Sequence, residues 1–103
     1  MQEKIKRIAN CYGLAKQQRQ LSEECAELIQ ATSKFVRLQE ESYKLTVDWK
    51  YLQNVIEEIA DVEIMLEQMK YLLHINSEAI EEIKKNKLDR EVGRIEEMEK
   101  HNG

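Results

Sequence analysis

Two pairs of acidic residues stand among apolar residues, and their side chains could hold a metal ion. Glu24 and Glu27 belong to the segment Glu-Cys-Ala-Glu, and Glu58 and Asp61 belong to Glu-Ile-Ala-Asp. The i, i+3 spacing makes the two carboxylates of each pair neighbours on one face of a helix. If the two helices pack antiparallel, the pairs meet across an interaxial gap of about 8–10 Å. This arrangement predicts a metal site between two antiparallel helices.

The four carboxylates share helix faces that should be turned toward the core. A helical wheel places apolar residues on the carboxylate side of both helices, namely Leu21, Leu28 and Phe35 on one and Val55, Val62, Met65, Met69 and Leu73 on the other. A buried carboxylate without a counter-charge is strongly destabilising. An all-oxygen ligand set without histidine favours Mg²⁺, with Mn²⁺ as a substitute. The alternative is a purely structural role, in which these acids pair with lysines of another helix.

The elements that must position these acids are helices. The chain has 103 residues, no proline, three glycines and 35% charged residues, a composition typical of long amphipathic helices. We expect one all-α domain spanning residues 1–103, a bundle of four or five helices. The periodicity predicts helices at about 3–18, 20–41, 48–74 and 78–99, with a loop at 42–47 and Ser77 as the cap of the last helix. The first helix could break near residues 12–14 and the last near 86–89. The second helix could begin afresh near Ser22 or simply continue from the first.

Charge and cysteine content exclude several classes of protein. A net charge of −4 argues against a general duplex-binding protein, which would carry a basic stripe. The two cysteines, Cys11 and Cys25, are too few for a disulfide scaffold, so we expect reduced thiols in the core. No apolar run reaches the ~20 residues that span a bilayer, and Met1–Lys4 does not begin a signal peptide. We therefore expect a soluble, cytoplasmic protein.

The segments SEECAEL (22–28) and IEEIADV (56–62) together resemble the all-α nucleoside triphosphate pyrophosphohydrolases. This is the MazG-like group, which is related to the dimeric dUTP and dCTP pyrophosphatases. The resemblance implies that Glu24, Glu27, Glu58 and Asp61 are the Mg²⁺ ligands. It implies Mg²⁺-dependent cleavage of a nucleoside triphosphate to the monophosphate and pyrophosphate. Glu24 or Glu27 would deprotonate the metal-bound water.

Basic and aromatic residues supply candidate contacts for such a substrate. Lys34 lies two helical turns beyond Glu27 and could bind a phosphate. Lys87, Arg90 and Arg94 share one helix face and could also bind phosphates, the alternative being a solvated helix paired with Glu91 and Glu97. Trp49 is a candidate stacking platform for the base, the alternative being a core anchor. No Gly-x-x-x-x-Gly-Lys-Ser/Thr loop is present, which excludes a P-loop mechanism.

The helix predicted at 48–74 is apolar around much of its circumference. Four short helices do not easily cover so much apolar surface, so we expect a homo-oligomer, a dimer or tetramer. Two other functions remain open. One is a non-catalytic helical interaction module, a bundle or coiled-coil adaptor. The other is a remnant of the enzyme family that binds nucleotides without turnover.

Overall fold

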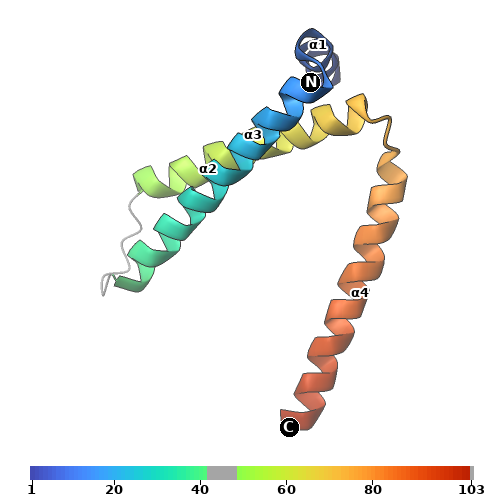
Figure 1. Cartoon of the computed structure of the whole chain (residues 1–103). Coiled ribbons are helices and arrows are strands. Elements are labelled where there is room, and N and C mark those ends of the chain that lie inside the picture. Colours follow the sequence, from blue (N-terminus) through green and yellow to red (C-terminus); the bar gives the residue numbers. More distant parts are fainter. Residues whose placement is uncertain (42–48, 103) are drawn as a thin grey trace. The chain divides into compact units, whose positions relative to one another are not determined.

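The computed structural model of the chain describes residues 1–41 and 49–102, and in these ranges it contains four α-helices and no strand (Figure 1). The helices are α1 (Gln2–Tyr12), α2 (Leu14–Glu41), α3 (Trp49–Leu72) and α4 (Ser77–Asn102). The all-α prediction is confirmed. The loop predicted at 42–47 lies outside the described residues.

Gly13 separates α1 from α2. Its φ of 81° lies in the left-handed region, which glycine adopts without steric cost. The Gly13 N–H donates to the carbonyl of Ala9 at 2.8 Å, and the N–H of Gln17 donates to the carbonyl of Gly13 at 3.0 Å. The break predicted near residues 12–14 is therefore confirmed. No second start occurs near residues 20–22: α2 runs without interruption from Leu14, because Leu14–Gln20 consists of good helix formers, which agrees with the alternative that the helix continues.

Asn76, rather than Ser77, caps the last helix. The Asn76 Oδ1 accepts a hydrogen bond from the N–H of Glu78 at 2.9 Å, and Ser77 is already the first residue of α4. An asparagine in this position satisfies an N–H that has no partner within the helix. The break considered near residues 86–89 is absent, because that stretch contains no proline or glycine and α4 runs through it.

The chain divides into two compact units, Met1–Leu73 and His74–Gly103. In the first unit, α2 and α3 run antiparallel and side by side, and α1 packs against both of them (Figure 1). The Tyr71 hydroxyl of α3 donates to Asn10 Oδ1 of α1 at 3.0 Å. The buried apolar side chains of the described residues are few: Ala9, Ala31, Val55, Val62 and Met65. The predicted inward face of α3 is thereby confirmed for three positions.

α4 behaves differently, since none of its residues is buried. Its apolar side chains Ile83, Leu88, Val92 and Met98 are 52–65% exposed. The prediction that the last helix joins the same bundle therefore stays a prediction. In the described ranges, no helix is both long and apolar enough to cross a membrane.

The two cysteines are free thiols, as predicted. The expected core position is wrong for Cys11, which is exposed on α1, whereas Cys25 is half-buried on α2. Ala9 is the buried residue of α1. Cys11 follows it by two residues and therefore points to another side of the helix.

Candidate metal centre

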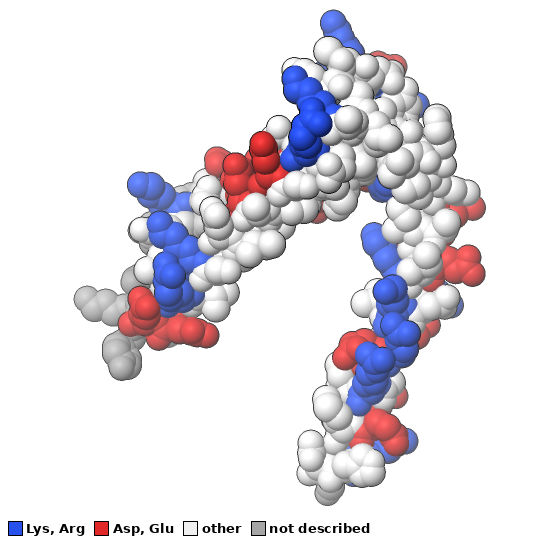
Figure 2. Space-filling view, in the orientation of Figure 1, with Lys and Arg blue, Asp and Glu red and all other residues white. Residues whose placement is uncertain are grey.

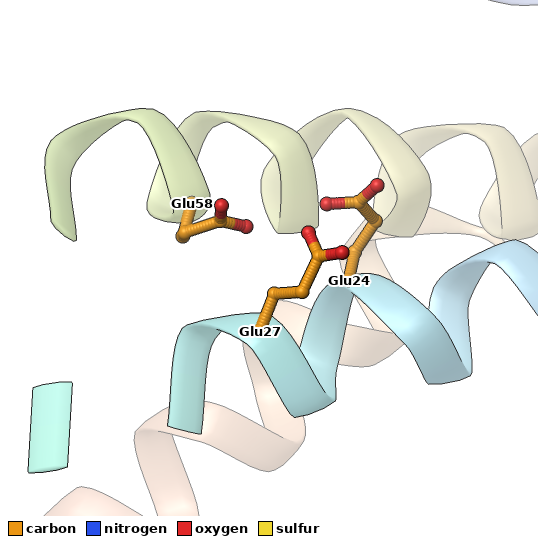
Figure 3. A group of neighbouring side chains, drawn as sticks. All are labelled: Glu24, Glu27 and Glu58. Atoms are coloured by element: carbon orange, nitrogen blue, oxygen red, sulfur yellow. The ribbon is translucent and has the colours of Figure 1, made fainter. Parts of the chain in front are cut away.

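Three carboxylates converge in the space between α2 and α3. Glu24 and Glu27 extend from α2, Glu58 extends from α3, and their carboxylates point toward one another (Figure 3). One oxygen atom of each lies within 4.8 Å of the others. The structure therefore brings together three of the four predicted ligands. The arrangement depends on the antiparallel pairing of α2 and α3, which sets the two acidic segments opposite each other.

The cluster contains carboxylate oxygens that lack a partner. Glu24 and Glu58 are half-buried, Glu27 is exposed, and the Oε2 atoms of Glu24 and Glu58 are buried without a hydrogen bond. Gln20 donates to the cluster: its Nε2 donates to Glu24 Oε1 at 2.8 Å. Buried oxygens without donors are costly. An oxygen-binding cation would satisfy them.

Three ion pairs between described residues lie away from the cluster. They join Lys70 to Glu67, Lys84 to Glu81 and Arg94 to Glu91. Among the residues that the structure describes, no lysine or arginine forms an ion pair with an acid of the cluster. This weighs against the structural alternative, in which these acids pair with lysines of a neighbouring helix. Figure 2 shows acidic side chains gathered over the middle of the α2–α3 pair, with basic side chains on both sides of them.

Proximity and burial change the acidity of the cluster. Desolvation raises the pKa of the Glu58 carboxyl above its ordinary value of 4.5, and the neighbouring carboxylates of Glu27, Asp61 and Glu24 raise it further. Desolvation and the charge of Glu24 likewise raise the pKa of Asp61 above 3.8. At Glu58 and Asp61, neighbouring carboxylates thus disfavour the ionised form, as expected for like charges that share a site without a cation.

Asp61 lies one helical turn beyond Glu58 on α3. It is close enough to Glu24 for that carboxylate to raise the pKa of Asp61. It is exposed and does not belong to the group of three whose oxygens lie within 4.8 Å. Its role as the fourth ligand stays a prediction.

Lys34 and Trp49, two of the predicted substrate contacts, line the same pocket. The pocket has a volume of about 450 Å³ and is also lined by Tyr51 and Glu57, the residue before Glu58. The Nζ of Lys34 lies 4.9 Å from the centre of the Tyr51 ring, a cation–π distance. Trp49 is 65% exposed, so the alternative that it anchors the core is wrong. Whether it stacks on a base stays a prediction.

Lys87, Arg90 and Arg94 all lie on α4 in the second unit and are exposed. The spacing that placed them on one helix face holds, because α4 is continuous. Arg94 Nη1 is 3.0 Å from Glu91 Oε2, one of the pairings expected for a solvated helix. The contact of these three residues with phosphates stays a prediction.

Two glutamines that were not predicted as site residues extend the line of the acidic pairs. Gln17 precedes Glu24 by seven residues on α2, and Gln68 follows Asp61 by seven on α3. Both glutamines are buried. The signal was available: a seven-residue step is close to two turns, so it keeps a residue on the same stripe.

Comparisons with known protein families, with curated proteins and with solved structures found no match to this chain. The resemblance to the MazG-like group therefore stays a prediction based on the two acidic segments.

Proposed function

We propose that this protein hydrolyses a nucleoside triphosphate to the monophosphate and pyrophosphate in a Mg²⁺-dependent reaction. The observation that carries the proposal is the convergence of Glu24, Glu27 and Glu58 from two helices, with two of their oxygens buried and without a donor. Exposed acids seldom need an explanation, but half-buried ones that repel each other do.

The residues of the cluster fit a hard divalent cation. Glu24, Glu27 and Glu58 would hold Mg²⁺, with Mn²⁺ as a substitute, and Asp61 would be the fourth ligand. Bound Mg²⁺ would neutralise charge on the triphosphate and lower the pKa of a coordinated water. Of the two candidate bases, Glu27 is exposed and therefore open to a water molecule. Glu24 already accepts a hydrogen bond from Gln20, which holds its side chain in place.

Lys34 would bind the terminal part of the triphosphate. It lies seven residues beyond Glu27 on α2, and its pocket is lined by Glu57, next to the cluster. A lysine acts as a point charge toward phosphate oxygens. Lys87, Arg90 and Arg94 would add further phosphate contacts.

A second copy of the chain would cover the remaining apolar surface of α3. Ile56, Ile59, Ile64 and Leu66 are 42–47% exposed, which is unusual for four large aliphatic side chains on one helix. We propose a homodimer or homotetramer with helix-on-helix contacts. Sedimentation analysis at micromolar concentration tests this: a monomer throughout would contradict it.

The activity is tested by measuring pyrophosphate release from the common and several damaged nucleoside triphosphates, with Mg²⁺ and with chelator. Metal-dependent release of pyrophosphate together with the monophosphate supports the proposal and identifies the preferred nucleotide. No turnover across the whole panel would contradict it.

A second candidate function is the non-catalytic helical interaction module. It is favoured by α4, whose apolar side chains are exposed along the helix. It predicts that Mg²⁺ does not stabilise the protein and that no nucleotide is hydrolysed. The nucleotide-binding remnant predicts stabilisation by nucleotides without pyrophosphate.

A further inference from the structure

A second pocket lies in the first unit, where α1, α2 and α3 meet. Its volume is about 390 Å³, within the range of small-molecule sites. Tyr12 of α1, Gln17 and Gln20 of α2, and Met65 and Gln68 of α3 are among the residues that line it. This pocket is distinct from the one that contains Lys34 and Trp49.

Two of its lining residues are buried glutamines whose side-chain oxygen has no hydrogen-bond partner. Gln17 is 4% exposed and Gln68 is 2% exposed, and the Oε1 atom of each has no hydrogen bond. A buried amide oxygen without a donor costs stability that an apolar side chain of the same shape would not cost. Glutamines of this kind are therefore better explained by a ligand that donates to them than by packing.

One residue, Gln20, connects this pocket to the carboxylate cluster. Gln20 lines the pocket and also donates to Glu24 Oε1 at 2.8 Å. The pocket and the carboxylate cluster are therefore adjacent, with Gln20 between them. A separation of seven residues on each helix puts the glutamines about 10 Å along the helix axis from Glu24 and Asp61. This length suits the ribose and first phosphates of a nucleotide. Lys34 lies at the opposite end of the cluster, where the terminal phosphate would reach.

We infer that this pocket binds the base of the substrate and selects bases that carry an exocyclic amino group, as adenine and cytosine do. The inference rests on the proposed function. A carboxamide pairs in a bidentate manner with an adjacent amino donor and ring-nitrogen acceptor. The Oε1 atoms of Gln17 and Gln68 accept from the amino group, whereas a uracil or hypoxanthine base presents a carbonyl oxygen there. Tyr12 and Met65 pack against the faces of the ring.

This assignment differs from stacking on Trp49. The Trp49 side chain is 65% exposed, and a solvated indole discriminates poorly between bases, since every base has a stacking face. The glutamine pocket contains buried hydrogen-bonding groups. A site built to hydrogen-bond a substrate group rejects analogues that lack it.

The test compares Gln17→Met and Gln68→Met with Gln18→Met. Gln18 is exposed on the same turn of α2, where its Nε2 donates to Ser22, which makes it a matched control. Methionine preserves the length of the side chain and removes the buried Oε1 atom that has no donor, so we expect little change in the stability of the fold. Circular dichroism and a thermal melt verify folding before any ligand is added.

Two readouts are needed. The first is kcat/KM for the amino-bearing nucleotides ATP and CTP against ITP and UTP. We expect a preference for the amino-bearing bases, which falls about 10- to 100-fold in Gln17→Met and Gln68→Met and is unchanged in Gln18→Met. An unchanged preference in both pocket variants, or its loss in Trp49→Ala instead, overturns the inference.

The second readout is calorimetric binding of the same nucleotides to Glu58→Gln, with and without Gln68→Met. It needs no turnover, so it separates the two proposals. Selective binding that depends on Gln68, together with an inactive wild-type protein, supports the base pocket and contradicts the hydrolase. Turnover without amino-base selectivity supports the hydrolase and overturns the pocket.

Discussion

The acidic pairs of α2 and α3 and the acidic pairs of α4 have the same spacing and opposite surroundings. Glu78 with Glu81, and Glu96 with Glu99, repeat the i, i+3 pattern. All four are exposed, and Glu81 is paired with Lys84 at 3.2 Å. The spacing of two acids is therefore no evidence for a site. The apolar neighbours that carry the acids into a helix interface are what distinguish the cluster.

The cluster and the acids of α4 also differ in whether their carboxylate oxygens have hydrogen-bond donors. In the first unit the Oε2 atoms of Glu24 and Glu58 are buried and unpartnered, whereas α4 is solvated along its whole length. Water satisfies an exposed carboxylate at no cost to the fold, and a surface ion pair contributes little. A half-buried cluster of like charges destabilises the fold, and either protonation or a bound cation would reduce that repulsion.

The largest effect should come from Glu58→Gln, with Glu81→Gln as the matched control. Glutamine keeps the shape of the side chain but removes the negative charge that holds a cation. We expect kcat/KM for pyrophosphate release to fall at least about 100-fold, since groups that merely orient metal ligands are worth 10- to 100-fold. Glu81→Gln should leave the activity unchanged. Full activity in Glu58→Gln would exclude it as a ligand.

The next effect is stabilisation by metal. With Mg²⁺ at about 100 times its dissociation constant, the folded state should gain about 2.7 kcal/mol. A thermal melt with and without Mg²⁺ measures this gain, which Glu24→Gln should reduce and Glu99→Gln should not. An equal shift in both variants would mean that the cation binds elsewhere or acts only by screening charge.

The metal-free protein should lose stability as the pH rises. The folded state raises the pKa of Glu58 above 4.5 and that of Asp61 above 3.8, so just above these values it binds more protons than the unfolded state. The free energy of unfolding then falls as the pH rises through the window between the ordinary and the raised pKa. Mg²⁺ should oppose this trend, because it binds the deprotonated carboxylates.

Urea unfolding of the metal-free protein between pH 4 and pH 8 measures the trend. Glu58→Gln should flatten it, and Glu81→Gln should leave it as in the wild type. A stability that rises steadily across the window where these two groups titrate would contradict the clash of carboxylates in the cluster.

Much of this arrangement could be predicted from residue pattern. The 3.6-residue periodicity predicted helices and the inward side of α3, which Val55, Val62 and Met65 confirm. The same wheel predicted that Glu24 and Glu58 would lie near the interface. The break near residues 12–14 was predicted from Gly13, a single positive-φ residue that ends one helix and allows the next to begin at once.

The glutamine pocket could not be predicted so easily. A helical wheel places Gln17 and Gln68 on the stripe of the acids, but their polar residue type predicts exposure to solvent. Their burial depends on the close packing of α1 across α2 and α3, which is a tertiary contact. The hydrophobic periodicity of a single helix does not predict such tertiary contacts.

The smallest effects should come from the glycines, and they should have opposite signs in the two units. Gly13 has a φ of 81°, and a side chain there is strained even though nothing lies within 4 Å of a Cβ. Gly13→Ala should therefore destabilise the first unit by about 1 kcal/mol. Gly93 lies within α4, also with nothing within 4 Å. Gly93→Ala should stabilise that helix by about 0.5–1 kcal/mol.

Urea unfolding followed by circular dichroism at 222 nm distinguishes the two glycine variants. Because α4 buries no residue, its helix content depends on intrinsic propensity, so Gly93→Ala should increase the helical signal of the native protein. A loss of stability in Gly93→Ala would mean that a partner or a second copy packs closely at that position. α4 would then resemble the helices of the first unit, because packing contacts and not only intrinsic helix propensity would stabilise it.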